Sequence, residues 1–94
     1  MIQDIKKRAS HRAKILEGQI KGLQKQIENE EYCMSILTQG LAIQKSTASL
    51  NKLILENHIR THIKDKLSSG SPDDQETAIE ELLELYELGN IRSK

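Results

Sequence analysis

Apolar and polar residues alternate with a helical period along the first third of the chain. Every third or fourth residue is apolar between residues 4 and 29, which places these side chains on one face of an α-helix. This stripe consists of Ala9, Ala13, Leu16, Ile20, Leu23 and Ile27. The pattern predicts a first helix that begins near residue 3 or 4 and ends near residue 29.

The central part of the chain, residues 32–67, reads as one long helix that no proline interrupts. Two apolar stripes coexist on it. One includes Ile36, Ile43 and Ile54, and the other includes Leu37 and Leu55. A helix that is apolar on more than one side needs more than one packing partner, which a single three-helix chain does not provide. We therefore expect this helix to pack against a second copy of the chain.

The last part of the chain carries strong signals for the end of one helix and the start of another. Gly70 is typical of a helix C-terminus, and Ser71 followed by Pro72 is typical of an N-cap and a first helical turn. The pattern predicts a third helix to about Leu88, ended by Gly89, with residues 90–94 frayed. The expected fold is all-α, a single domain over residues 1–94 with a long central helix.

Composition also favours association between copies. The chain has 94 residues and no tryptophan or phenylalanine, so a core of Ile, Leu and Ala gains burial by oligomerising. No apolar run is long enough for a membrane span or a signal peptide. We expect a soluble, cytosolic protein that forms at least a homodimer.

The formal net charge is zero, but the charges are unevenly distributed. Residues 1–25 hold seven basic and two acidic side chains, whereas residues 68–94 hold two basic and seven acidic ones. Such an asymmetry can place an anion-binding face on a neutral protein, with DNA as one possible partner. The alternative is that both segments are ordinary solvated helix faces.

The candidate chemistry lies at the two ends of the central helix. Cys33 is the only cysteine, and His58 and His62 are four residues apart, so their rings project from the same helical face. Cys33 and His58 on one continuous helix would lie roughly 37 Å apart. An antiparallel dimer would instead bring Cys33 of one chain opposite the two histidines of the other.

One thiolate and two imidazoles suit copper(I), zinc, nickel or cobalt better than magnesium or calcium. The alternative is that Cys33 only packs and that the histidines are plain surface residues. No phosphate loop, dinucleotide fingerprint, nucleophile with oxyanion donors or paired-carboxylate signature stands out, so we do not expect an enzyme. No zinc-finger or helix-turn-helix spacing is present either, so DNA binding would depend on a basic surface.

Three segments resemble the CsoR/RcnR family of bacterial helical repressors, which sense copper(I), nickel or cobalt, or formaldehyde. They are HRAKILEGQIKGL from His11, EYC ending at Cys33, and ENHIRTH ending at His62. The resemblance covers about residues 5–88. It implies a dimer of dimers that binds operator DNA when metal-free and releases the DNA when the effector binds.

The resemblance implies that Cys33 and His58 are ligands, whereas position 62 is where the sensors of this family diverge. Copper sensors usually have cysteine there, and nickel and cobalt sensors have histidine, as in this chain. The nickel and cobalt pattern also uses a histidine close to the N-terminus, where this chain has Met1, Ile2 and Gln3, with His11 the nearest substitute. Formaldehyde sensors have proline at the position of Ile2.

The resemblance also suggests supporting roles for residues outside the ligand set. Tyr32 and Glu81 match positions thought to couple the metal site to DNA release, although packing and solvation alone could also account for them.

Arg12 matches a DNA-contacting arginine. The same basic stretch supplies Arg8, Lys14 and Lys21, while Ile15 stands where the family often has another basic residue.

The leading hypothesis is a repressor that releases DNA when copper(I) binds Cys33 of one chain and His58 and His62 of another. Copper(I) is favoured because no N-terminal histidine completes a nickel or cobalt site. Three alternatives remain: a nickel- or cobalt-responsive repressor with the same site, a formaldehyde-responsive repressor that uses Cys33, and a helical assembly module without a DNA role. Zinc is a further possible ligand.

Overall fold

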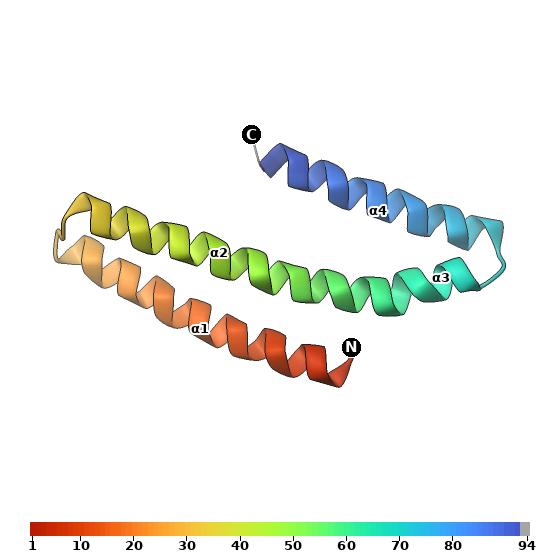
Figure 1. Cartoon of the computed structure of the whole chain (residues 1–94), viewed down its shortest axis with the longest axis horizontal. Coiled ribbons are helices and arrows are strands. Elements are labelled where there is room, and N and C mark those ends of the chain that lie inside the picture. Colours follow the sequence, from red (N-terminus) through yellow and green to blue (C-terminus); the bar gives the residue numbers. More distant parts are fainter. Residues whose placement is uncertain (93–94) are drawn as a thin grey trace. The chain divides into compact units, whose positions relative to one another are not determined.

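The structure is a computed structural model that describes the backbone of residues 1–92 and the side chains of residues 1–89. The described elements are all helical, namely α1 (Gln3–Glu28), α2 (Cys33–His58), the π-helical segment η1 (Ile59–Ile63), α3 (Lys64–Ser68) and α4 (Pro72–Arg92). Because η1 and α3 continue α2, the chain has three main helical runs, which confirms the predicted all-α class (Figure 1).

Residues 1–57 form one compact unit and the residues from His58 onward form another. In the first unit, α1 and α2 run antiparallel side by side (Figure 1). Ile5 and Ala9 from α1 form a buried cluster with Leu53 from α2. Nearer the connection between the helices, the side-chain amide of Gln39 donates a hydrogen bond to the carbonyl of Gln19 at 3.0 Å. Of the apolar stripe predicted for the first helix, Ala9 is buried against α2, whereas Ile20 and Ile27 expose 50% and 55% of their surface.

The start of α1 is attached to the end of α2 by a hydrogen bond. The backbone N–H of Ile2, the N-cap residue of α1, donates to Oδ1 of Asn57 at 2.9 Å. Asn57 is the buried polar residue of this part of the chain, with 6% of its surface exposed. A buried amide oxygen needs a donor, and the N-terminal backbone supplies one.

The long central helix is confirmed, with one departure from regular geometry. Helical structure continues from Cys33 to Ser68, close to the predicted range of 32–67. The backbone at His58 and at Lys64, on either side of η1, stays in the right-handed helical region. The sequence pattern did not predict the π-helical turn between them. Such turns are rare and frequently occur at functional sites.

The second unit is a hairpin in which α3 packs against α4. Gly70 has a φ of 78° and ends the helix before it, as the sequence indicated. The hydroxyl of Ser71 accepts a hydrogen bond from the backbone N–H of Asp74 at 3.4 Å, which confirms the predicted N-cap. Ile63 and Ala78 are the buried apolar side chains described in this unit.

The predicted end of the last helix was wrong. The helix continues through Gly89 to Arg92, so residues 90–92 are helical rather than frayed, while residues 93–94 lie outside the described part of the chain. Gly89 does not adopt a positive φ. A glycine inside a helix costs only about 1 kcal/mol relative to alanine, and it ends a helix only where the chain turns into the left-handed conformation.

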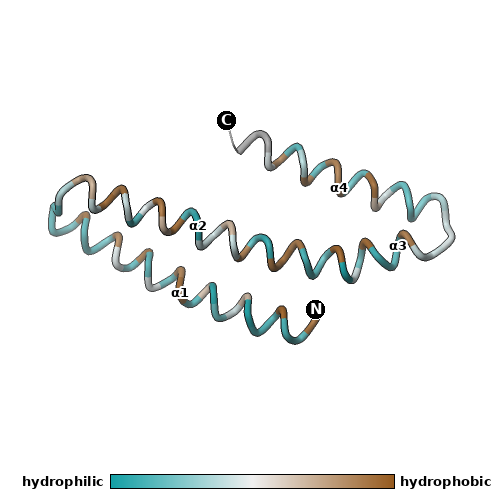
Figure 2. Tube along the Cα trace, viewed as in Figure 1, coloured by the Kyte–Doolittle hydropathy of each residue, from teal (hydrophilic) through white to brown (hydrophobic). Residues whose placement is uncertain are grey.

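Many large apolar side chains remain exposed in a single chain. Apolar residues recur along α2 (Figure 2), and among them Leu37 and Leu41 expose 60% and 59% of their surface. On α4, Leu83 and Tyr86 are 59% and 70% exposed. Exposed apolar area on this scale typically marks an interaction surface. The observation agrees with the expected self-association, although the number of subunits stays a prediction.

Candidate metal site and basic helix

Two histidines at the end of the central helical run point their rings toward each other. His58 is the last residue of α2 and His62 lies in η1. Their Nδ1 atoms are 3.3 Å apart, and the ring centroids are 5.3 Å apart with a tilt of 48° between the planes. The predicted convergence of these two side chains is therefore present in the structure.

Glu81 from α4 lies against the other side of the His58 ring. Its Oε2 atom is 2.7 Å from Nε2 of His58, and its Oε1 atom is 3.1 Å from Nζ of Lys66. All three side chains are about one third exposed. The hydrogen bond from His58, followed by that from Lys66, lowers the pKa of Glu81 and keeps it ionised. The resemblance had suggested a supporting role for Glu81, and the structure places it in direct contact with His58.

The contact with Glu81 determines which His58 nitrogen is available. An ionised carboxylate can only accept, so Nε2 of His58 carries a proton, and a neutral ring then has a lone pair at Nδ1. Nδ1 of His62 lies 3.3 Å from this atom and can donate to its lone pair in the tautomer that carries the proton on Nδ1. Metal-binding histidines commonly donate their second nitrogen to a carboxylate in this way.

The distance between the two Nδ1 atoms also fits a shared ion. Two imidazole nitrogens bound to one tetrahedral or trigonal ion lie about 3.3–3.6 Å apart, given bond lengths of about 2.0–2.1 Å. The observed 3.3 Å lies within this range. The residues present therefore fit two nitrogen ligands of a transition metal when Nδ1 of both rings carries a lone pair.

The predicted third ligand, Cys33, is the first residue of α2 and is an exposed free thiol. The preceding residue, Tyr32, exposes 76% of its surface. Within the described part of one chain, no three histidine, cysteine or acidic side chains come close enough to hold a metal together. The structure of one chain thus brings together two of the three predicted ligands, and the role of Cys33 stays a prediction.

Lys66 is a residue of this site that the sequence analysis missed. It is eight residues after His58, a spacing that leaves two side chains about 80° apart around a regular α-helix. No motif of the sequence could have revealed its contact with Glu81, because that contact depends on η1 and on the packing of α4.

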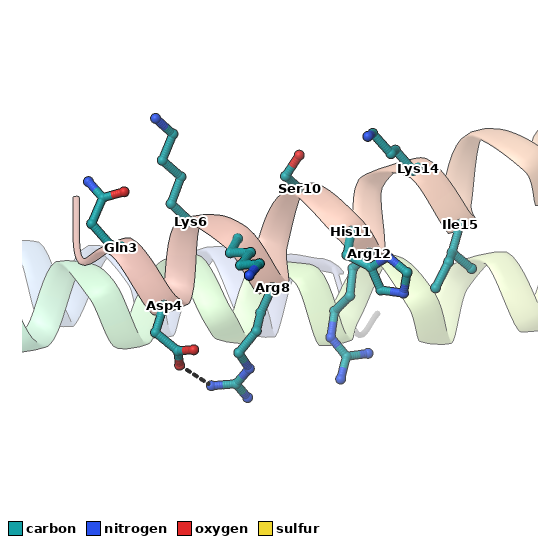
Figure 3. Close-up of a pocket in the computed structure, with 10 residues that line it drawn as sticks. Gln3, Asp4, Lys6, Arg8, Ser10, His11, Arg12, Lys14 and Ile15 are labelled. Atoms are coloured by element: carbon teal, nitrogen blue, oxygen red, sulfur yellow. Dashed lines mark ion pairs between the residues drawn. The ribbon is translucent and has the colours of Figure 1, made fainter.

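The basic residues of α1 are distributed around the helix rather than gathered on one face. Figure 3 shows Lys6, Ser10 and Lys14 on one side of α1, and Arg8 and Arg12 on the opposite side. The five side chains named here line an open region of the surface, and all residues that line it belong to α1.

Two of the predicted DNA-binding side chains have acidic neighbours on the same helix. Arg8 forms an ion pair with Asp4 at 3.5 Å, and Lys21 forms one with Glu17 at 3.3 Å. Such exposed pairs are weak and can be exchanged for phosphate contacts. His11, considered above as a substitute ligand, is an exposed residue of α1.

Among the described helices, none combines the length and apolar character needed to cross a bilayer.

Comparison with known proteins identifies close relatives over most of the chain. The family model described as metal-sensitive transcriptional repressor matches residues 5–87. The copper-sensing transcriptional repressor CsoR of Bacillus subtilis strain 168 is 37% identical over 81 residues, covering 86% of this chain and 77% of the relative. CsoR of Mycobacterium tuberculosis strain H37Rv is 32% identical over 80 residues, covering 84% of this chain and 65% of the relative.

A solved structure is also similar. It is the crystal structure of the copper-sensing repressor CsoR with Cu(I) from Geobacillus thermodenitrificans NG80-2, which superposes with a TM-score of 0.73 at 27% sequence identity. The alignment covers 92% of this chain and 88% of that chain.

Proposed function

The chain belongs to the family of metal-sensitive transcriptional repressors, and we propose that it is a copper(I)-responsive repressor. In this proposal the metal-free protein binds operator DNA and releases it when copper(I) binds. Support for copper comes from the relatives, since the similar proteins from Bacillus and Mycobacterium are copper-sensing repressors and the similar solved structure holds Cu(I). The proposal treats residues 1–94 as one DNA-binding and metal-sensing domain.

The proposed ligands are Cys33 of one subunit and His58 and His62 of another. The observation that carries this assignment is the arrangement around His58. Its Nε2 atom is held by Glu81 at 2.7 Å, while its Nδ1 atom lies 3.3 Å from Nδ1 of His62. Such an arrangement leaves one nitrogen of His58 ready to bind a metal.

Each protein group has a distinct task in this proposal. Glu81 fixes the orientation and the protonation of the His58 ring. The exposed Cys33 would supply a thiolate, a ligand that favours a soft ion. Copper(I), when bound, would supply a soft centre suited to a thiolate and two imidazoles. A copper site made across two subunits exists only in the oligomer, which agrees with the exposed apolar side chains of α2 and α4.

The proposed DNA contacts come from the basic residues of α1, namely Arg8, Arg12, Lys14 and Lys21. These side chains would bind phosphates, so affinity for DNA should fall steeply with salt. Copper(I) would release DNA by binding the low-affinity conformation more tightly. Since coupling between two binding sites is reciprocal, DNA must then weaken copper binding by the same factor.

An anaerobic titration tests the proposal. A fluorescent operator fragment is bound at low salt, and its anisotropy is followed while copper(I), nickel(II) or formaldehyde is added. Release by copper(I) that is abolished in Cys33→Ala supports the proposal. Release by nickel(II) alone would replace copper with nickel or cobalt, release by formaldehyde alone would indicate a thiol sensor, and a failure to bind DNA would refute the repressor function.

A further inference from the structure

The carboxylate of Glu81 uses each of its oxygen atoms for a different partner. Oε2 accepts from His58 at 2.7 Å, and Oε1 accepts from Lys66 at 3.1 Å. Glu81 projects from α4. His58 comes directly before η1, and Lys66 lies in α3, directly after η1. A carboxylate held at one oxygen can still rotate about its last bond, but one held at both oxygens cannot.

The π-helical turn explains how Lys66 reaches this carboxylate. In a regular α-helix, eight residues turn the chain by about 800°, which would leave Lys66 roughly 80° around the helix from His58. The i→i+5 turns of η1 rotate the chain less per residue. They therefore bring Lys66 back toward the face of His58, where both side chains meet Glu81.

We propose that Lys66 is a positioning residue for the metal ligand His58 and that it acts through Glu81. This inference rests on the proposed function, since it assumes that His58 binds the metal. Lys66 holds one oxygen of Glu81, so that the other oxygen stays directed at Nε2 of His58. The ring then keeps its proton on Nε2 and its lone pair on Nδ1, the atom that faces His62.

The competing interpretation is an ordinary ion pair between α3 and α4. Because the side chains of Lys66 and Glu81 are each 32% exposed, such a pair would contribute little to the free energy of unfolding. It would also leave the protonation of His58 unaffected. The two interpretations differ in what the loss of Lys66 does to the His58 ring, which can be measured without metal.

The test compares Lys66→Met with Lys66→Arg and with Lys64→Met in the full-length chain. Methionine keeps the length of the side chain but removes the donor, whereas arginine keeps a donor and the charge. Lys64 is an exposed lysine two residues away and serves as the matched control. Nitrogen-15 NMR of the histidine rings in the metal-free protein, at a pH of about 8 where an ordinary histidine is neutral, reports which nitrogen carries the proton.

For His58 in Lys66→Met, we expect a mixture of Nε2- and Nδ1-protonated rings in place of the Nε2 form. We also expect about tenfold weaker copper(I) binding in competition with a chromogenic chelator, the lower end of the range for groups that support a metal-bound histidine. Lys66→Arg should restore both properties and Lys64→Met should change neither. If Lys66→Met matches Lys64→Met in either measurement, the inference is overturned.

His58→Ala separates this inference from the proposed function. If copper(I) binding is unchanged in His58→Ala, the proposed site itself is wrong. If copper(I) binding is lost in His58→Ala but is unaffected in Lys66→Met, only the role of Lys66 is refuted.

Discussion

The Nε2 atom of His58 and the Oε2 atom of Glu81 are 2.7 Å apart, which joins the end of the central helix to α4 by a charge-assisted hydrogen bond. The opposite nitrogen of the same ring faces His62. A single contact therefore fixes the orientation of the His58 ring and leaves Nδ1 as the nitrogen that faces His62.

Removal of the Glu81 carboxylate should weaken metal binding. In Glu81→Ala, His58 loses the acceptor of its Nε2 proton, so we expect copper(I) affinity to fall by about 10- to 100-fold. Competition with a chromogenic copper(I) chelator measures the effect. Glu84→Ala removes an exposed carboxylate from the same helix and should leave the affinity unchanged. Equal affinities of the two variants would contradict a supporting role for Glu81.

The lowered pKa of Glu81 predicts how stability depends on pH. Because the carboxyl pKa is lower in the folded than in the unfolded protein, its contribution to stability is fully present above the unfolded value of about 4.3. The contribution is lost as the pH falls through the folded pKa. Urea unfolding from about pH 6 to about pH 3 should thus show a larger loss of stability in the unmodified protein than in Glu81→Gln. Parallel curves for the two proteins would argue against this contribution.

Mixed oligomers can show whether the metal site crosses between subunits. Cys33→Ala and His58→Ala should each abolish tight copper(I) binding when pure. After the two variants are unfolded together and refolded, each mixed antiparallel dimer should regain one intact site, formed by Cys33 of one subunit and His58 and His62 of the other.

Copper(I) titration of the refolded mixture measures the recovery. With random pairing, half of the dimers are mixed, so about a quarter of the sites of the unmodified protein should return. A site within one chain would give no recovery at all.

Replacement of Arg12 should weaken DNA binding without changing sequence preference. If Arg12 contacts a phosphate, Arg12→Ala should lower affinity for operator and unrelated DNA by similar factors and should reduce the slope of log affinity against log salt by about one. Anisotropy titrations at several salt concentrations measure the slope. Lys64→Ala, which removes a lysine outside α1, is the control, and an unchanged slope in Arg12→Ala would remove this residue from the interface.

The buried amide of Asn57 should contribute to stability by anchoring the start of α1. Asn57→Ala removes the acceptor of the Ile2 N–H bond, so we expect a loss of about 1–3 kcal/mol in the free energy of unfolding. We also expect faster amide hydrogen exchange at the first turn of α1. Asn51→Ala alters an exposed amide on the same helix and should change neither quantity. Similar behaviour of the two variants would show that the bond is dispensable.

The sequence by itself determined the three helical runs, because periodic apolar positions and the signals at Gly70, Ser71 and Pro72 act locally. It also identified His58 and His62 as a pair, since a four-residue spacing on a helix suffices to bring two side chains together. It misjudged Gly89, where the local propensity for a turn was too weak to end α4.

Only the tertiary structure decided how the histidine pair is supported. Packing of α4 brings Glu81 to His58 across 23 positions of sequence, and η1 turns Lys66 toward the same carboxylate. Neither contact follows from helical periodicity, because one depends on how two helices pack and the other on a break in that periodicity. For the same reason, the sequence could list the candidate ligands of a metal, whereas the fold was needed to show that Nε2 of His58 contacts Glu81 and that Nδ1 faces His62.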